Sequence, residues 1–251
     1  MSFIVRVVVW LSGFVKPLSR LGLCRFEAYT QGQPLKILLV GYNGARNTGA
    51  DARVVALTRQ LEQALGTEKA ELTVMTLDRD NVAGYFPKHV WLLHFTTVFV
   101  FSLLRACSRH HVAILCEGST LTPTFAEALC VFFCEAAGIM RRQGKPCIAY
   151  GGEVGAMTPY LERTVRELCS NVFFMARSES SREAAAELGL ESQLLLQVDE
   201  SDLAARLLVA LDYAYDNREA VSAQLAAGRV ALETRLHDMS SWFAERAHSI
   251  R

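Results

Sequence analysis

Residues 35–51 read LKILLVGYNGARNTGAD, and this stretch decides the fold. Residues 35–40 form an apolar run of strand type, a loop rich in glycine and asparagine follows, and a helix is predicted to begin near Ala50. A strand, a glycine-rich loop and a helix in this order are typical of the opening unit of an α/β protein that binds a nucleotide or another anion. The stretch therefore predicts an α/β fold.

The loop itself allows two interpretations. The free N–H groups at a helix start attract negative charge, and glycine lets a ligand come close to the backbone. The spacing matches neither G-x-G-x-x-G nor G-x-x-x-x-G-K-[ST], which excludes the dinucleotide fingerprint and the Walker loop. The loop is then either an anion site of another kind or a tight turn whose polar residues only cap the helix.

Composition limits the class of protein. The chain has 251 residues, 51% of them apolar, which is enough for one large domain or two small ones. Its 26 Lys and Arg balance 26 Asp and Glu, and this balance argues against a nucleic-acid partner, which usually needs a basic excess. Seven cysteines, an odd number without a C-x-x-C pair, indicate a reducing, cytoplasmic compartment and no disulfide framework. We expect neither a metal nor a cofactor.

Strands and helices alternate along the chain as far as residue 197. Further strands, apolar almost throughout, are predicted at residues 72–77, 112–116, 146–150, 172–176 and 193–197. Helices are predicted at residues 51–65, 125–143, 159–169 and, with Ser180 or Ser181 as its cap, up to 188; the long apolar stretch 90–104 is predicted as a buried crossover helix. Continuous apolar strands between helices are typical of a parallel sheet that is covered on both faces. We therefore expect a doubly wound parallel α/β sheet.

Two flanking segments differ from this pattern. Residues 1–33 form an N-terminal extension, residues 34–198 the sheet domain, and residues 199–251 a C-terminal helical segment. In the extension, apolar residues recur at helical spacing with basic residues between them. Either this helix packs on the sheet domain, or residues 3–25 lie on a membrane surface as a basic amphipathic segment.

Small and charged residues follow the predicted strands at their carboxyl ends, where open parallel sheets bind ligands. These residues are Asn47, Thr48, Gly49 and Asp51, then Glu117, Gly118 and Ser119, then Gly151, Gly152 and Glu153, and finally Arg177. We assign Arg177 and Glu117 as candidate catalytic residues and the rest as substrate-binding residues. A planar guanidinium suits a carboxylate or a phosphate. The alternative is structural: Glu117 and Glu153 as surface or capping carboxylates, and Arg177 paired with Glu179 or Glu117.

The order of these segments resembles the polysaccharide pyruvyl transferase family over about residues 35–190. The resemblance rests on Asn47–Asp51, Cys116–Ser119, Gly144-Lys145-Pro146 leading to Tyr150–Glu153, and Arg177-Ser178-Glu179 with Ser181 and Leu188-Gly189. Two motifs depart from the family: its D-E pair is Ala50-Asp51 here, and its G-G-G loop is Glu117-Gly118-Ser119. The resemblance implies a Rossmann-like half of a B-type glycosyltransferase-like fold. The family's second half, with its Arg/His-containing motif, is expected to be absent.

The resemblance also implies an activity. Family members transfer a pyruvyl group from phosphoenolpyruvate to a sugar of a cell-surface polysaccharide or of its lipid-linked precursor. Such chemistry needs a general acid and cations for the phosphate and the carboxylate. Arg177 would supply one cation, whereas the sequence does not identify the acid. The alternative is a shortened, non-catalytic member that acts as a binding module and self-associates to cover an exposed apolar face.

Overall fold

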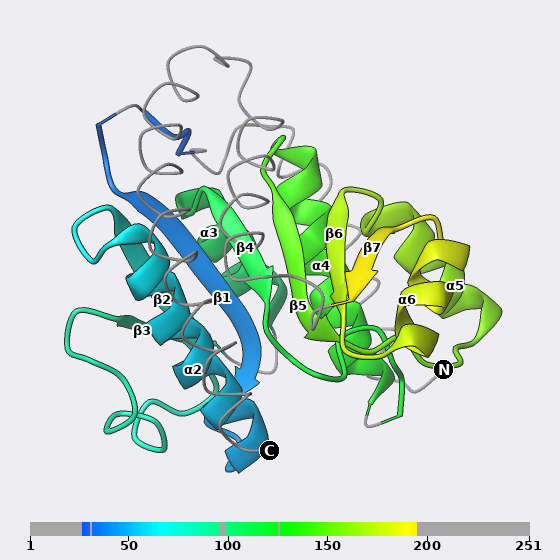
Figure 1. Cartoon of the computed structure of the whole chain (residues 1–251), viewed down its shortest axis with the longest axis horizontal. Coiled ribbons are helices and arrows are strands. Elements are labelled where there is room, and N and C mark those ends of the chain that lie inside the picture. The colour runs from blue at the N-terminus through cyan, green and yellow to red at the C-terminus, as the bar shows by residue number, and fades with distance from the viewer. Residues whose placement is uncertain (1–26, 31, 96–98, 125, 195–251) are drawn as a thin grey trace, which may run out of the picture.

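The computed structural model describes residues 27–30, 32–95, 99–124 and 126–194, and these form one seven-stranded parallel sheet (Figure 1). The strands are β1 (Leu35–Asn43), β2 (Ala70–Thr76), β3 (Trp91–His94), β4 (Val112–Leu115), β5 (Cys147–Gly152), β6 (Val172–Ala176) and β7 (Glu191–Leu194). The helices are α2 (Thr48–Leu65), α3 (Phe99–Arg109), α4 (Glu127–Arg142), α5 (Pro159–Leu168) and α6 (Glu179–Glu187). The strand order is β3-β2-β1-β4-β5-β6-β7. The predicted doubly wound parallel α/β fold is confirmed.

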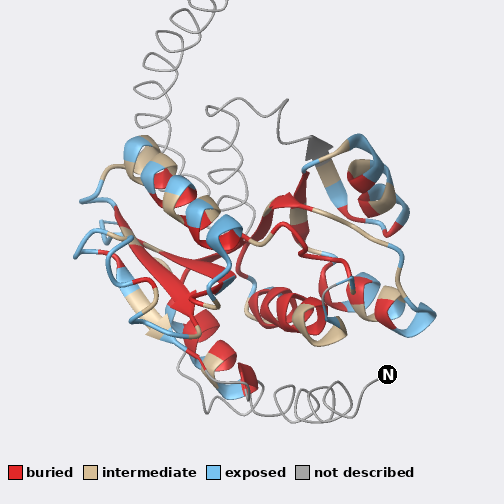
Figure 2. Cartoon of the chain, turned by 90° about the horizontal axis from the view of Figure 1, so that it is seen from below, coloured by how far each residue is buried: buried red, intermediate tan, exposed pale blue. Residues whose placement is uncertain are grey.

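Helices lie on both sides of the buried strands (Figure 2). On one face, Val54, Leu57 and Leu61 of α2 share a core cluster with Ile37 and Leu39 of β1. On the other face, a larger cluster joins the sheet to α3, α4 and α5. Because both faces are covered, the central strands are apolar almost throughout, as the sequence predicted.

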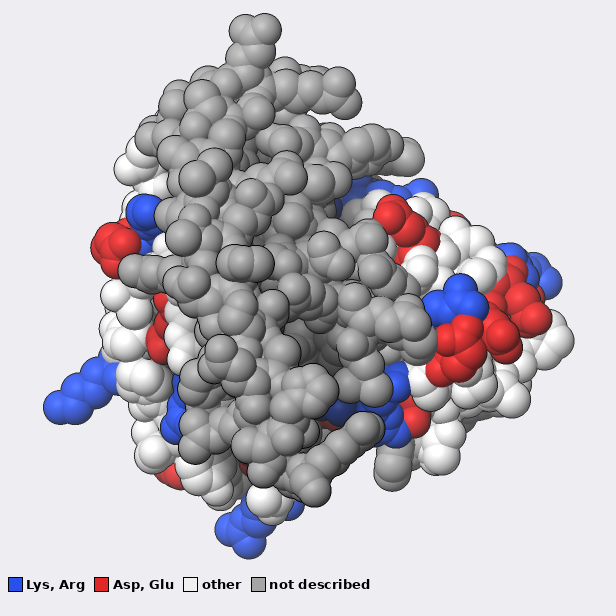
Figure 3. Space-filling model, in the orientation of Figure 1, with Lys and Arg blue, Asp and Glu red and all other residues white. Residues whose placement is uncertain are grey.

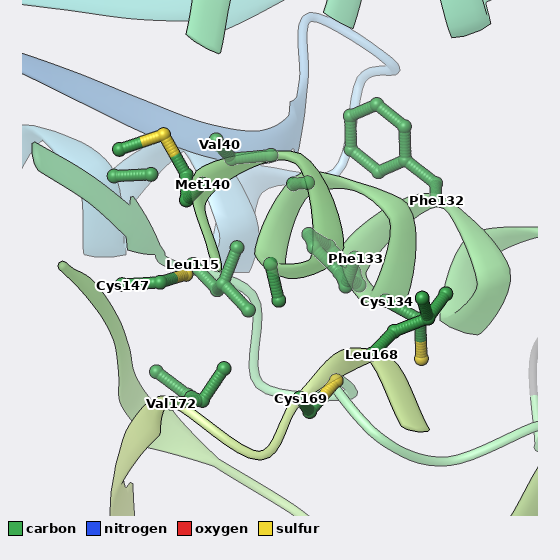
Figure 4. Close-up of a cluster of buried hydrophobic side chains, with 14 of the residues drawn as sticks. Val40, Leu115, Phe132, Phe133, Cys134, Met140, Cys147, Leu168, Cys169 and Val172 are labelled. Atoms are coloured by element: carbon green, nitrogen blue, oxygen red, sulfur yellow. The ribbon is translucent and has the colours of Figure 1, made fainter. Parts of the chain in front are cut away.

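The larger cluster contains most of the sulfur atoms (Figure 4). Cys134 of α4 and Cys169, which ends α5, lie in it beside Phe133 and Leu168. The six described cysteines are free and buried. Burial raises the pKa of the Cys107 thiol to about 12, so this side chain stays protonated at neutral pH. These cysteines pack as small hydrophobic residues, while Cys24 lies outside the described residues.

The prediction of one helix over residues 90–104 is wrong. Residues Trp91–His94 form the edge strand β3, which pairs in parallel with β2, and α3 begins only at Phe99. The β2 strand has backbone groups on its outer edge that need partners, and four residues of β3 provide them. An edge strand also tolerates an exposed side chain, and Trp91 is 65% exposed.

Two smaller predictions also need correction. The cap of α6 is Ser178 rather than Ser180 or Ser181, because the Ser178 Oγ accepts a hydrogen bond from the Ser181 N–H at 3.3 Å. Strand β7 begins at Glu191, two residues before its predicted start. Both shifts fall at element boundaries, which apolar periodicity defines poorly.

The flanking segments lie largely outside the described residues. The predicted extension up to residue 26 and the predicted C-terminal helices are not described, so their assignments stay predictions. In the described part of the chain, no helix has the length and hydropathy needed to cross a bilayer. In the view of Figure 3, acidic and basic side chains lie next to each other at the α5 and α6 end of the molecule, in keeping with the zero net charge.

Candidate functional site

The strand order reverses between β1 and β4, which lie side by side in the sheet (Figure 1). From β1 the chain moves outward to β2 and β3, whereas from β4 it moves to β5, β6 and β7 on the other side. In open α/β sheets the crevice at the carboxyl ends of two such strands is the usual ligand site. The candidate residues of the sequence analysis lie at the carboxyl ends of β1, β4, β5 and β6 at this edge, although Gly151 and Gly152 are the last two residues of β5 and do not follow it as predicted.

The loops beyond β4, β5 and β6 are joined by backbone hydrogen bonds. The Glu153 N–H donates to the Gly118 carbonyl at 2.7 Å, and the Leu121 N–H donates to the Glu153 carbonyl at 3.0 Å. The Arg177 N–H donates to the Gly152 carbonyl at 3.1 Å. These bonds extend the ladder past the sheet and fix the backbone at four predicted site positions, Gly118, Gly152, Glu153 and Arg177.

The turn after β1 is held by its own polar side chains. The Asn47 Oδ1 accepts from the Ala50 N–H at 3.4 Å and caps α2. The buried Asp51 Oδ1 accepts from the Gly44 N–H at 3.0 Å. The tight-turn interpretation therefore accounts for Asn47 and Asp51, while Thr48 and Gly49 remain exposed at the helix start.

Arg53 is the site residue that the sequence analysis missed. Its Nη1 donates to the carbonyl oxygen of Gly151 at 2.7 Å and lies 3.5 Å from that of Tyr150. Gly151 has a φ of 64°, a left-handed conformation that favours glycine. The Tyr150 hydroxyl donates in turn to the Gln60 Oε1 at 2.9 Å. Two hydrogen-bonded side chains thus tie α2 to the end of β5.

Arg177 forms an ion pair with Glu153 through its Nη2. The structural alternative for Arg177 named the wrong partners, Glu179 and Glu117, since Arg177 pairs with Glu153 and Glu179 pairs with Arg182. The reason is the ladder described above, which places Glu153 and Arg177 on neighbouring loops. The Arg177 side chain is 51% exposed and that of Glu153 is 35% exposed, so this pair lies at the protein surface.

The two arginines meet at Gly118. A β-carbon at this position would lie 3.4 Å from the Arg53 Nη2 and 3.5 Å from the Arg177 Nη1. In each guanidinium, one terminal nitrogen is bonded to the protein and the other lies next to Gly118. Two cations beside a residue without a side chain are an arrangement that can hold a carboxylate or a phosphate.

Glu117 lies half-buried beside this pair. Its Oε1 accepts from the Gly118 N–H at 3.0 Å. Burial raises the pKa of the Glu117 carboxyl above its ordinary value, although the Gly118 N–H and Arg53 act in the opposite direction. Asp51 raises it further through like charge. Its raised pKa and its place beside Arg53 make the Glu117 carboxyl the candidate proton donor of this site.

The other two predicted residues of these loops have packing roles. Ser119 is buried. A β-carbon at Gly152 would lie 2.8 Å from the Phe174 Cζ and 2.9 Å from the Thr120 Oγ1, so close packing requires glycine there. The structure therefore brings Glu117, Gly118, Gly151, Glu153 and Arg177 together with Arg53, while Gly152 and Ser119 are buried.

The Gly-Lys-Pro motif lies at the opposite edge of the sheet. The buried Lys145 Nζ donates to the carbonyl oxygens of Cys107 and Ser108, at 3.0 Å each, and so caps the C-terminus of α3. His110 and His111 are buried in the same region. These residues lie at the amino ends of the strands, opposite to the candidate site, so they do not take part in it. Their role is structural.

A surface pocket lies between α2 and the segment 84–87. It is lined by Val55, Thr58, Arg59 and residues 84–87. Its one basic side chain is Arg59, and the residues that line it include no carboxylate. The paired arginines at Gly118 therefore make the stronger candidate site.

In comparisons with models of protein families, with curated proteins and with solved structures, the chain gave no match.

Proposed function

We propose that the chain is a polysaccharide pyruvyl transferase-like protein. It would bind phosphoenolpyruvate at the carboxyl edge of the sheet and transfer the pyruvyl group to a sugar of a cell-surface polysaccharide or of its lipid-linked precursor. The observation that supports this proposal is the convergence of Arg53 and Arg177 on Gly118. Phosphoenolpyruvate carries a phosphate and a carboxylate, and each guanidinium can donate to one of them through the terminal nitrogen that lies next to Gly118.

Glu117 is the proton donor of the proposed reaction. Its carboxyl proton passes to C3 of phosphoenolpyruvate, which becomes the methyl group, while a sugar hydroxyl oxygen bonds to C2. The bond between C2 and the phosphate oxygen then breaks, phosphate leaves with the electron pair, and a second hydroxyl of the same sugar closes the ketal. One hydroxyl proton restores the Glu117 carboxyl and the other leaves with phosphate. Arg53 and Arg177 stabilise the charge on the leaving group.

The ordered motifs at this edge add support from the sequence. Asn47–Asp51, Cys116–Ser119 and Tyr150–Glu153 occur in the order that the family shows, and they lie on neighbouring loops. Thr48 and Gly49 are exposed at the start of α2 and remain candidates for sugar or phosphate contacts. Under this proposal the reaction takes place in the cytoplasm, with residues 3–25 near the membrane that carries the lipid-linked acceptor.

The direct test is acceptor-dependent release of phosphate. The purified full-length chain is incubated with phosphoenolpyruvate and a panel of mono- and oligosaccharides, and phosphate and product mass are measured. The proposal expects a product that is heavier than the acceptor by one ketal-linked pyruvate, together with one phosphate. A Glu117→Gln variant should bind phosphoenolpyruvate and release no phosphate. Phosphate binding without product from any acceptor would overturn pyruvyl transfer.

A second candidate function is a non-catalytic binding module. Five large aromatic side chains are exposed among the described residues, namely Tyr42, Tyr85, Trp91, Phe101 and Tyr160, and Trp91 lies on the edge strand β3. Contiguous patches of exposed apolar side chains mark surfaces where two proteins meet. If this candidate is correct, the chain self-associates, and a Trp91→Ser and Phe101→Ser double variant sediments as a monomer in analytical ultracentrifugation. A monomeric wild-type chain would exclude self-association.

A further inference from the structure

Glu153 is the one carboxylate that contacts either arginine of the site directly among the described residues, through its ion pair with the Arg177 Nη2. In an anion site, such a carboxylate has two possible roles. It either competes with the anion for the arginine, or it holds the arginine in the position that the anion needs. The two roles predict opposite effects of removing Glu153.

The geometry around Gly118 favours the second role. The Glu153 carboxylate accepts a hydrogen bond from the Nη2 of Arg177, whereas the Arg177 nitrogen next to Gly118 is the Nη1. An anion above Gly118 can therefore accept from the Nη1 while the ion pair stays closed. Arg53 shows the same division, because its Nη1 is bonded to the Gly151 carbonyl and its Nη2 lies next to Gly118.

The backbone holds both partners of the ion pair. The Glu153 N–H donates to the carbonyl of Gly118 at 2.7 Å, and the Arg177 N–H donates to that of Gly152 at 3.1 Å. Glu153 is thereby fixed relative to Gly118, the residue beside which the anion would lie. Its carboxylate can fix Arg177, whose half-exposed side chain would otherwise sample many rotamers.

We infer that Glu153 is a positioning residue, which orients Arg177 toward an anion above Gly118, and that the ligand adds to the ion pair without breaking it. This inference rests on the proposed function only for the identity of the ligand as a phosphate- and carboxylate-bearing molecule. Pre-orientation of Arg177 lowers the entropy lost on binding, which strengthens the affinity.

Two substitutions separate orientation from charge. Glu153→Ala removes the charge and the acceptor oxygen, whereas Glu153→Gln removes the charge and keeps an oxygen that can accept from the Arg177 Nη2. Calorimetry with phosphoenolpyruvate should show an affinity about five- to tenfold weaker for Glu153→Ala, because a rotamer-rich side chain must then be ordered on binding. Glu153→Gln should stay within about twofold of the wild type, since its amide oxygen restores the orientation.

The matched control is Glu179→Ala. Glu179 is a nearby exposed carboxylate whose partner is Arg182, so this variant changes the net charge by the same amount and leaves Arg177 paired. Its affinity for phosphoenolpyruvate should equal that of the wild type. Thermal unfolding of each variant verifies that it is folded.

The outcomes distinguish this inference from the proposed function. Binding by Glu153→Ala that equals or exceeds that of the wild type overturns the positioning role, as does a Glu153→Gln variant as weak as Glu153→Ala. Either result leaves the proposed site in place. A wild-type chain that binds neither phosphoenolpyruvate nor inorganic phosphate overturns both. If the variants bind with the expected order of affinities but no acceptor-dependent turnover occurs, the positioning role of Glu153 is supported. Only the proposed transferase activity is then overturned.

Discussion

The Arg53 Nη1 lies 2.7 Å from the carbonyl oxygen of Gly151, and this hydrogen bond connects the helix after β1 to the carboxyl end of β5. It spans the point where the strand order reverses. It also fixes the guanidinium so that its Nη2 lies next to Gly118. One side chain therefore joins α2 to the end of β5 and contributes a cation beside Gly118.

An Arg53→Lys variant tests both roles of this side chain. A lysine keeps the charge, but it has a single ammonium group in place of the rigid, forked guanidinium. It therefore cannot bond the Gly151 carbonyl and an anion at Gly118 at the same time. We expect the affinity for phosphoenolpyruvate to fall about tenfold, which corresponds to the loss of one charge-assisted hydrogen bond. Titration calorimetry measures this change. Arg59→Lys, an exposed position on the same helix, is the control and should bind like the wild type.

A Gly118→Ala variant fills the space between the two arginines. The added methyl group would be 3.4 Å from the Arg53 Nη2 and 3.5 Å from the Arg177 Nη1, which are ordinary contact distances, so the fold should tolerate it. The methyl group would nevertheless occupy the place of the anion. We expect an unchanged melting temperature and at least about tenfold weaker binding. Gly84→Ala, where nothing lies within 4 Å, is the matched control, and equal binding by the two variants would contradict the placement of the ligand.

A Gly44→Ala variant tests the turn after β1. Gly44 has a φ of 76°, and a β-carbon there would lie 2.5 Å from the Asp78 carbonyl oxygen and 2.9 Å from its amide nitrogen. Backbone strain and this clash together should lower the free energy of unfolding by about 2 kcal/mol or more. Gly144→Ala is the control, since its φ is also positive but nothing lies within 4 Å, and it should cost only about 1 kcal/mol. Urea denaturation measures both values, and similar values for the two variants would show that the contact with Asp78 is unimportant.

Lys145 gives a pH-dependent contribution to stability at alkaline pH. Burial lowers the pKa of its ammonium group to about 8, from an ordinary value of 10.5. Between these pH values the unfolded chain binds more protons than the folded chain, so this group makes the folded state more stable as the pH rises from about 8 to 10.5. Lys145→Met removes this dependence and two hydrogen bonds to α3 carbonyls. We expect the variant to be about 1–3 kcal/mol less stable at pH 8 and the deficit to grow at higher pH; a constant deficit would contradict the assignment.

The two buried histidines make the stability of the folded chain depend on pH in the acidic range. Burial lowers the pKa of His110 and that of His111 to about 4, from 6.5. Lys145, Lys36 and Glu27 are the charged groups around them, and the two lysines lower both values further. The unfolded chain therefore binds more protons between pH 4 and 6.5, and the stability of the folded chain falls as the pH falls through that window.

Urea denaturation at several pH values measures this effect. The slope near pH 5 should approach about 1.4 kcal/mol per pH unit for each histidine that takes up a proton on unfolding. A His110→Asn or His111→Asn variant should lose about one such contribution. A wild-type slope that neither substitution reduces would contradict protonation of these histidines as the cause.

Much of the fold follows from the sequence because its central strands are apolar on both faces. The stretches around Ile114, Ile148 and Phe174 have no polar alternation, and only a sheet covered on both sides buries such segments. Strand β3 could not be predicted in this way. It is four residues long and its Trp91 side chain is exposed, so the pairing with β2 defines it and its own pattern does not.

The candidate site could be predicted in part for a similar reason. Glu117, Glu153 and Arg177 directly follow strands, and parallel strands bring such positions to one edge. Arg53 lies inside α2, where a charged residue on a helix is usually solvated, so the loops alone did not indicate it. The sequence did contain one signal for Arg53, which lies in the first turns of the helix after β1. That end of the helix lies at the same edge of the sheet as the candidate loops.

The measurement that tests the central claim most directly is calorimetric binding of phosphoenolpyruvate to the wild-type chain, to Arg53→Ala and to Arg177→Ala. We predict that the wild type binds and that either substitution weakens binding by about tenfold or more, because each removes one of the two cations beside Gly118. Absence of binding by the wild type at millimolar ligand, or equal binding by all three proteins, would contradict an anion site formed by these two arginines.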